Sequence, residues 1–110
     1  MKTALVTGGS RGIGKAIAFK LGESANVAVG YSSSKEQATE VVNYIQNNGG
    51  NALAVEIDVT DNDSVEKCFE LVEKEFSSVD ILVNNAGITK DNIFPRLKQD
   101  EWDSVIDTNL

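Results

Sequence analysis

Short apolar runs alternate with amphipathic helical patterns along this chain of 110 residues, and that alternation constrains its fold more than any other feature. Between the runs, apolar residues recur at the spacing of one helix face, as they do from Ala38 to Ile45. Strands that are apolar on both faces and joined through helices pack as a parallel sheet covered on each side. The sequence therefore predicts an α/β fold, a doubly wound parallel sheet. Its predicted strands lie within residues 4–6, 27–29, 52–59 and 81–83.

The first apolar run leads into a glycine-rich turn that opens a predicted helix, Thr7-Gly8-Gly9-Ser10-Arg11-Gly12-Ile13-Gly14. Glycines allow a tight turn and let the backbone approach a pyrophosphate closely. The N-terminus of the following helix offers free N–H groups and the positive end of its dipole to the phosphates. This strand–turn–helix context favours a dinucleotide-binding sheet of Rossmann type, with strand order 3-2-1-4, over a merely structural glycine turn.

The same residues also fit G-x-x-x-x-G-K, the pattern of nucleoside-triphosphate-binding loops, from Gly9 to Lys15. In that motif the next residue is Ser or Thr, because its hydroxyl binds magnesium. Ala16 stands at that position and offers no ligand atom. The residues therefore favour a dinucleotide over a magnesium-bound nucleoside triphosphate.

The end of the second predicted strand bears on which dinucleotide is bound. Folds of this kind that bind NAD usually place an acidic residue there to hold the ribose 2′-hydroxyl. This chain has Gly30-Tyr31-Ser32 instead, with no carboxylate to repel a 2′-phosphate, and Arg11 and Lys35 can pair with that group. These residues favour NADP(H); the alternative is a solvated loop with a surface arginine. Tyr31 and Lys35 also have the Y-x-x-x-K spacing of some reductase active sites, but their position in a loop marks that match as accidental.

Polar residues follow the third and fourth predicted strands at the same edge of the sheet. Asp58 is predicted to accept a hydrogen bond from an adenine amino group, or alternatively to be a helix-entry aspartate. Asn84-Asn85-Ala86-Gly87 follows the fourth strand. Its amides either tie neighbouring strands together and line the cofactor cleft, or form an ordinary Asn/Gly turn.

Composition excludes several classes of function. Ten basic and seventeen acidic residues give a net charge of −7, which argues against binding to nucleic acid or to anionic membranes. The chain has no histidine and a single cysteine, Cys68, so we expect no internal disulfide, no His-based acid–base catalysis and no metal site. No apolar run has the length of a signal peptide or a transmembrane helix, and we expect a cytoplasmic protein.

The C-terminal segment is predicted to begin a further helix near Glu101-Trp102 that includes Val105-Ile106. The chain reaches Leu110 without a capping signal, and the fourth strand would form an unpaired apolar edge. We therefore expect residues 1–110 to be the N-terminal part of a single dinucleotide-binding domain, truncated at the start of the helix after the fourth strand.

Taken in order, four segments resemble the motifs of the short-chain dehydrogenase/reductase family: Thr7–Gly14, Asp58-Val59, Asn84-Asn85-Ala86-Gly87 and Asp107-Thr108-Asn109. Within that family, Asn84–Asp91 and Asp100-Glu101-Trp102 are most similar to the bacterial 3-oxoacyl-[acyl-carrier-protein] reductases. Those enzymes reduce the β-keto group of an acyl thioester with NADPH in fatty-acid synthesis. Acetoacetyl-CoA reductases are similar to the same segments, so that alternative stays open.

The resemblance implies roles for the matched positions. Asn109 matches the family's catalytic asparagine, which holds a water in a proton relay. Asp58 and Val59 would flank the adenine of the cofactor. With Tyr31 and Ser32, the remaining expected cofactor-binding residues are Gly8, Ser10, Arg11, Gly12, Ile13, Gly14, Asn85, Ala86 and Gly87.

The family's catalytic Ser, Tyr and Lys have no counterpart among these residues, nor do the helices of its homotetramer. In the family the tyrosine donates a proton, the lysine lowers its pKa and the serine positions the carbonyl. The resemblance thus implies that the parent protein is a homotetrameric reductase of 3-oxoacyl thioesters carried on acyl carrier protein or CoA. Residues 1–110 alone are expected to be inactive. The alternatives are another short-chain dehydrogenase and a nucleotide-binding fragment without catalysis.

Overall fold

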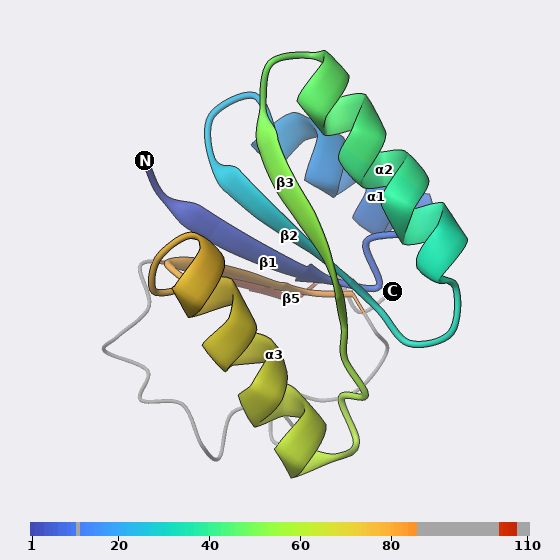
Figure 1. Ribbon diagram of the computed structural model, residues 1–110, viewed down its shortest axis with the longest axis vertical. Helices are drawn as coiled ribbons and strands as arrows, with labels where there is room; N and C mark the ends of the chain where they lie inside the picture. The colour runs from blue at the N-terminus through green and yellow to red at the C-terminus, as the bar shows by residue number, and fades with distance from the viewer. Residues whose placement is uncertain (11, 86–103, 108–110) are drawn as a thin grey trace.

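The computed structural model describes residues 1–10, 12–85 and 104–107, the last segment for its backbone alone. Strands and helices alternate from β1 to β4, as the sequence predicts, and the sheet has the order β3-β2-β1-β4-β5 (Figure 1). The elements are β1 (Thr3–Thr7), α1 (Gly12–Leu21), β2 (Asn26–Tyr31), α2 (Lys35–Asn47), β3 (Asn51–Glu56), α3 (Asn62–Glu75), β4 (Ile81–Asn84) and β5 (Ser104–Asp107).

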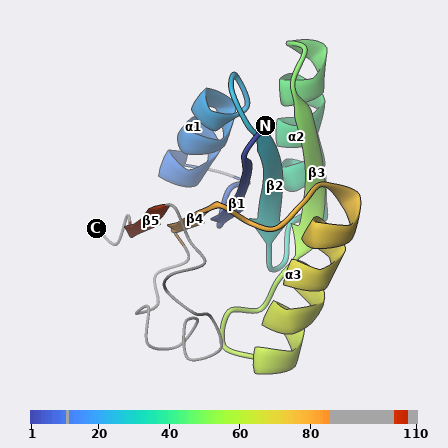
Figure 2. The ribbon, with the colours of Figure 1, turned by 90° about the vertical axis from the view of Figure 1, so that its left-hand side faces the viewer.

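All four strand pairings are parallel, and helices cover both faces of the sheet (Figure 2). Neighbouring residues of one strand therefore enter different cores. Leu5 and Leu82 pack with α3, whereas Val6 packs with α1 and α2 on the opposite face. Each fully buried leucine or valine of this kind stabilises the fold by roughly 1.5–3 kcal/mol. The predicted doubly wound sheet with strand order 3-2-1-4 is confirmed.

Local signals in the sequence account for the helix boundaries. The Asp61 carboxylate accepts a hydrogen bond from the Asp63 N–H at 3.0 Å and so caps α3. Helix α1 ends at Leu21, directly before Gly22. Helix α2 is followed by Gly49, whose φ of +87° lies in the left-handed region that favours glycine.

The helix predicted from Glu101-Trp102 is wrong over residues 104–107, which form β5 and pair with β4 from Ile81↔Ser104 to Asn84↔Asp107. The physical reason is the open edge of β4, whose backbone N–H and C=O groups gain partners when a strand is added. Valine and isoleucine at 105 and 106 also suit a strand. The third strand ends at Glu56, earlier than predicted, because the chain turns after Ile57 donates a backbone hydrogen bond to Tyr31 at 2.8 Å.

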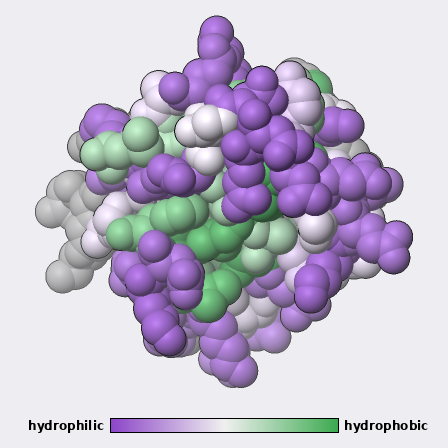
Figure 3. Space-filling model, turned by 45° about the horizontal axis from the view of Figure 1, so that its top comes forward, coloured by the Kyte–Doolittle hydropathy of each residue, from purple (hydrophilic) through white to green (hydrophobic). Residues whose placement is uncertain are grey.

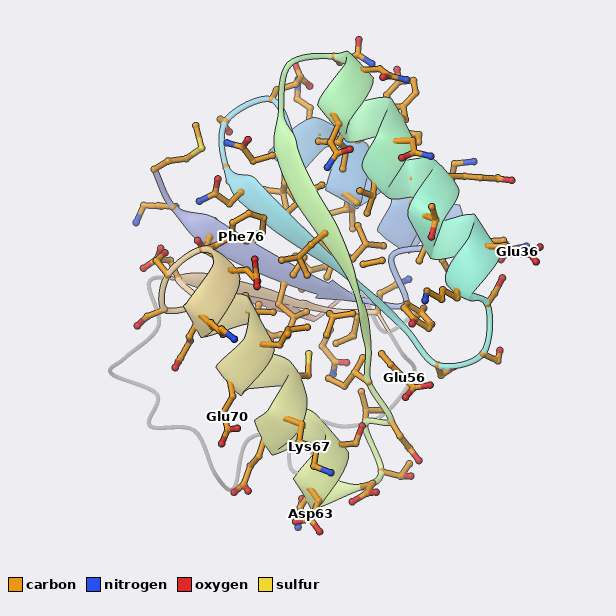
Figure 4. All side chains as sticks on the ribbon, viewed as in Figure 1. Glu36, Glu56, Asp63, Lys67, Glu70 and Phe76 are labelled. Carbon is orange, nitrogen blue, oxygen red and sulfur yellow. The ribbon has the colours of Figure 1, made fainter. Side chains whose placement is uncertain are left out.

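One face of the molecule is mainly hydrophilic. In the face shown in Figure 3, purple side chains surround a smaller apolar area. On α3, Asp63, Lys67 and Glu70 extend away from the sheet, whereas Phe76, just beyond the helix, lies toward it (Figure 4). No helix within the described part of the chain is long and apolar enough to span a membrane.

Candidate functional site

The carboxyl ends of the parallel strands meet at one edge of the sheet, where a cavity of about 130 Å³ opens. Strand register brings them together, since Thr7 pairs with both Gly30 and Asn84. Open α/β sheets bind ligands outside this edge. The cavity is lined by Thr7, Gly8, Ser10, Tyr31, Ser32, Ser33, Ser34, Ile57, Asp58 and Val59.

The glycines of the first turn serve three different purposes. Gly8 has a φ of +66°, so it makes the tight turn out of β1. Gly12 has a φ of +62°, and a Cβ added there would meet no atom within 4 Å. Gly14 is buried, and a Cβ added there would collide with the Gly8 carbonyl and lie 2.6 Å from Asn85 Nδ2. The turn thus exposes its backbone at Gly12 and packs tightly at Gly14.

A clamp between Thr7 and Asn85 holds this turn against the end of β4. The Asn85 N–H donates to Thr7 Oγ1 at 3.0 Å, and Asn85 Nδ2 donates to the Gly8 carbonyl at 3.3 Å. The buried Thr7 hydroxyl has its own acceptors, the Val83 carbonyl and Asn84 Oδ1, both at 3.3 Å. This is the strand-tying interpretation of the asparagine pair rather than a plain turn. The participation of Thr7 was not predicted, because its partner lies 78 residues away.

The loop from β2 to α2 forms a second wall of the cavity. Tyr31 is the last residue of β2 and Lys35 the first of α2, so the loop itself is limited to residues 32–34 and the two side chains do not share a helix face. Ser32, Ser33 and Ser34 all line the cavity. Only Ser32 was predicted there; a run of three serines after a strand end is the signal that could have indicated the others.

Asp58 lies at the third wall, in the connection from β3 to α3. Its Oδ1 accepts hydrogen bonds from the Thr60 N–H at 3.0 Å and from Thr60 Oγ1 at 2.6 Å. These bonds favour the ionised carboxylate, and they hold the pKa of Asp58 below its usual value. Among the residues that line the cavity, Asp58 alone carries a carboxylate. Glu36 and Glu56 are exposed and lie outside that lining (Figure 4).

The structure brings most of the described predicted residues together. Asn85 adjoins the cavity through Gly8, while Gly12 and Gly14 begin α1. Ile13 is 48% exposed in the first turn of α1. Cavity-lining residues that were predicted are Gly8, Ser10, Tyr31, Ser32, Asp58 and Val59. Arg11, Ala86, Gly87 and Asn109 lie outside the described residues.

A larger cavity, about 560 Å³, lies between α1 and α2 and is lined in part by Phe19, Tyr44 and Ile45. The Phe19 and Tyr44 rings stack there with centroids 4.1 Å apart. This cavity contains neither a strand end nor any residue of the glycine turn. The smaller cavity is therefore the candidate site, because the turn, the strand ends and the polar side chains converge on it.

The residues at the strand ends fit a dinucleotide. Gly12 leaves open space beside a left-handed backbone, which gives a phosphate close access to the start of the ten-residue helix α1. Elsewhere in the same cavity, polar contacts are offered by the hydroxyls of Ser32–Ser34 and by the carboxylate of Asp58. Fold and cavity together define a Rossmann-like α/β protein whose candidate site lies at the carboxyl edge of the sheet.

Comparison with known proteins specifies the family. The short chain dehydrogenase family model matches residues 2–110. The 3-oxoacyl-[acyl-carrier-protein] reductase FabG of Staphylococcus aureus strain Mu50 is 53% identical over 110 residues, covering 99% of this chain and 45% of that protein. FabG of Salmonella typhimurium strain LT2 is 47% identical over 109 residues, covering 99% and 43%. The chain belongs to the short-chain dehydrogenase family and spans less than half the length of these relatives.

Solved structures agree with that assignment. A dehydrogenase/reductase from Sinorhizobium meliloti 1021 superposes with a TM-score of 0.76 at 46% identity, covering 79% of this chain and 35% of that chain. The angucycline C-6 ketoreductase LanV, whose crystal structure contains NADP, superposes with a TM-score of 0.71 at 45% identity, covering 79% and 37%.

Proposed function

We propose that residues 1–110 are the N-terminal part of a dinucleotide-binding domain in an NADPH-dependent reductase of 3-oxoacyl thioesters. The observation that carries this proposal is the carboxyl-edge cavity with its open glycine turn. The similarity to two FabG proteins supports the reaction class. Bound NADPH would supply the hydride, and this part of the chain would bind and orient it.

The β2 end of the cavity supports NADP(H) over NAD(H). Ser32 and Ser33 offer hydroxyl donors where a carboxylate would repel a 2′-phosphate. Lys35 follows this wall at the start of α2, and Arg11 belongs to the glycine turn in sequence. We assign these two cations to the 2′-phosphate, since charge-assisted hydrogen bonds to phosphate are stronger than neutral ones. NADP in the LanV structure is consistent with this preference.

We assign the remaining parts of the dinucleotide to the other walls of the cavity. The backbone from Gly8 to Gly14 would hold the pyrophosphate, with Ser10 and Ile13 beside it. Asp58 would accept a hydrogen bond from the adenine amino group, with Val59 against the ring. We assign Asn85, Ala86 and Gly87 to the path from the adenosine toward the nicotinamide.

The chemistry of the reductase extends beyond these walls. We propose that Asn109 holds a water in the proton relay, and that the acyl group reaches the site on acyl carrier protein rather than on CoA. We further propose that the working protein is a cytoplasmic homotetramer. Residues 1–110 expressed alone are expected to show no reduction of acetoacetyl thioesters.

The cofactor choice is tested by titrating the full polypeptide that carries this sequence with NADPH and NADH, following nicotinamide fluorescence. Tighter binding of NADPH is expected. Ser32→Asp places a carboxylate at the β2 end and should weaken NADPH about tenfold, because like charges repel across the cavity. Ser24→Asp, at an exposed serine before β2, is the matched control and should leave both affinities unchanged. A wild-type preference for NADH would refute the assignment.

The substrate is tested with acetoacetyl-acyl carrier protein and acetoacetyl-CoA as paired substrates for the same polypeptide. A higher kcat/KM for the carrier-protein thioester is expected. Equal or higher efficiency with the CoA thioester would replace the carrier-protein proposal with acetoacetyl-CoA reduction. No NADPH oxidation with either thioester would refute the reaction class.

A further inference from the structure

The carboxylate of Asp58 is held by one neighbouring residue. Thr60 donates two hydrogen bonds to the same oxygen, Oδ1, one from its backbone N–H at 3.0 Å and one from its hydroxyl at 2.6 Å. Within the described residues no hydrogen bond reaches Oδ2. One carboxylate oxygen is thus anchored while the other is left for a ligand.

The backbone of Asp58 is fixed as well. Its N–H donates to Ser64 Oγ at 2.8 Å, and its carbonyl accepts from the Asp61 N–H at 3.0 Å. Both partners belong to the start of α3, since Asp61 caps that helix and Ser64 lies in its first turn. The connection from β3 to α3 therefore holds the Asp58 main chain against a helix that is packed on the core.

Burial contributes nothing to the orientation of the Asp58 side chain, which is exposed to solvent. An exposed carboxylate without a partner samples several rotamers, and a ligand that needs one of them loses affinity by selecting it. The two hydrogen bonds from Thr60 restrict that sampling before any ligand arrives. They also favour the charged form, which accepts hydrogen bonds most strongly.

We propose that Thr60 is a positioning residue for adenine recognition, acting by presenting the free oxygen of Asp58 to the exocyclic amino group. The inference rests on the proposed function, because it requires that Asp58 faces the adenine of the bound dinucleotide. Thr60 itself does not line the cavity, so it acts through Asp58. A residue that merely shaped the loop would change affinity for every ligand of the cavity equally.

The test compares NADP⁺ with nicotinamide hypoxanthine dinucleotide phosphate, which carries an oxygen in place of the adenine amino group. Dissociation constants are measured by calorimetry on the full polypeptide. The wild type is expected to prefer NADP⁺ about tenfold, as one charge-assisted hydrogen bond predicts. Thr60→Val removes the hydroxyl but keeps the N–H, and should reduce the preference to about threefold. Thr60→Ser restores the hydroxyl and should restore the preference.

Thr39→Val is the matched control. The exposed Thr39 hydroxyl donates to the Lys35 carbonyl at 2.9 Å on α2, so the variant loses the same chemistry away from Asp58. It should keep the full preference. As an independent readout, NMR titration of the nucleotide-free protein should show that Thr60→Val raises the pKa of Asp58 toward its ordinary value.

The outcomes separate the inference from the function on which it rests. A wild type that binds both dinucleotides equally would overturn the adenine contact and the positioning role with it. A wild type that discriminates, together with a Thr60→Val protein that discriminates equally, would overturn the positioning role alone. An unchanged Asp58 pKa in Thr60→Val would also overturn it.

Discussion

The two ends of the sheet are built differently. At the amino ends, side chains join the strands: Asn51 Nδ2 donates to Asn26 Oδ1 at 3.3 Å, and Asn26 Nδ2 donates to Thr3 Oγ1 at 3.4 Å. Thr3 Oγ1 also shares a hydrogen bond with Ser77 Oγ at 2.7 Å, and the Thr3 N–H donates to Asp80 Oδ2 at 3.0 Å. At the carboxyl ends, glycines and short polar side chains surround a cavity instead.

The difference teaches that one end of the sheet is closed by its own side chains, whereas the other end leaves room for the proposed nucleotide. A parallel sheet presents unpaired backbone groups at both ends, and buried polar groups must find partners. The amino ends satisfy that demand internally. The carboxyl ends keep backbone and hydroxyl groups available. The Thr7–Asn85 clamp holds the glycine turn in place beside the open cavity. Paired substitutions at the two ends should therefore cost similar stability and differ in their effect on NADPH.

The largest effect is expected for Gly14→Ala. Its Cβ would collide with the Gly8 carbonyl and crowd Asn85 Nδ2, so overpacking should lower the free energy of unfolding by about 3 kcal/mol. Affinity for NADPH should fall more than about tenfold, because the glycine turn must shift. Urea unfolding without nucleotide and fluorescence titration give the two quantities.

Gly50→Ala is the partner variant at the amino end. Its Cβ would lie 2.7 Å from the Gly22 carbonyl and from Ile45 Cγ2, which is comparable crowding just before β3. It should lose comparable stability and keep its NADPH affinity. An equal loss of affinity in both variants would break the division of roles between the ends.

The two buried threonines of β1 give the next comparison. Thr7→Val removes the hydroxyl that accepts from the Asn85 N–H, and Thr3→Val removes the bridge between Asn26 and Ser77. Each should cost about 2 kcal/mol, the penalty for unpaired polar groups that are partly or fully buried. Only Thr7→Val should weaken NADPH, by about fivefold, because Asn85 loses its anchor. Denaturant midpoints and NADPH dissociation constants are measured for both variants. An equal loss of NADPH affinity in Thr3→Val would contradict the comparison.

A smaller effect is expected where the added Cβ meets open space. Gly12 and Gly49 have φ values of +62° and +87°, and a Cβ added at either would contact no other part of the chain within 4 Å. Alanine at either position should cost about 1 kcal/mol through backbone strain alone. Thermal unfolding should therefore be similar for the two variants, while only Gly12→Ala lowers NADPH affinity. An unchanged NADPH affinity in Gly12→Ala would show that the pyrophosphate does not bind next to Gly12.

The smallest effect concerns the core between the two ends. Burial raises the pKa of the Cys68 thiol from 9.0 to about 12. The unfolded thiol ionises near pH 9 and the folded thiol does not, so its contribution is intact below pH 9 and is lost as pH rises toward 12. At pH 10 the loss is about 1 kcal/mol. The difference in unfolding free energy between wild type and Cys68→Ala, measured at pH 8 and pH 10, should shrink by that amount; a constant difference would show a solvent-accessible thiol.

Much of the fold is readable from the sequence because its signals are local. Apolar runs, the Asp61 cap and the glycines after helices act over a few residues, and each places a boundary close to the observed one. The strand at 104–107 was not predicted, because what decides it is the open edge of β4, which lies some twenty residues earlier. Helical spacing near Trp102 carries no information about that edge.

The candidate site is less readable for the same reason. The glycine turn and Asp58 can be recognised in the sequence because each directly follows a predicted strand or lies at its end. The hydrogen bond from Asn85 to Thr7 and the orientation of Asp58 by Thr60 depend on geometry that appears only when the strands are in register.

The bond between Thr7 and Asn85 has a kinetic consequence, because it closes a loop of 78 residues. The pairings of β1 with β2, of β2 with β3 and of β1 with β4 join segments separated by at least one helix, and such non-local contacts form slowly. The clamp that holds the glycine turn forms only when β4 has docked beside β1. A folding intermediate without β4 has the glycine turn but lacks the clamp that holds it. If the proposed function holds, NADPH added during refolding should therefore stabilise the finished sheet more than that intermediate.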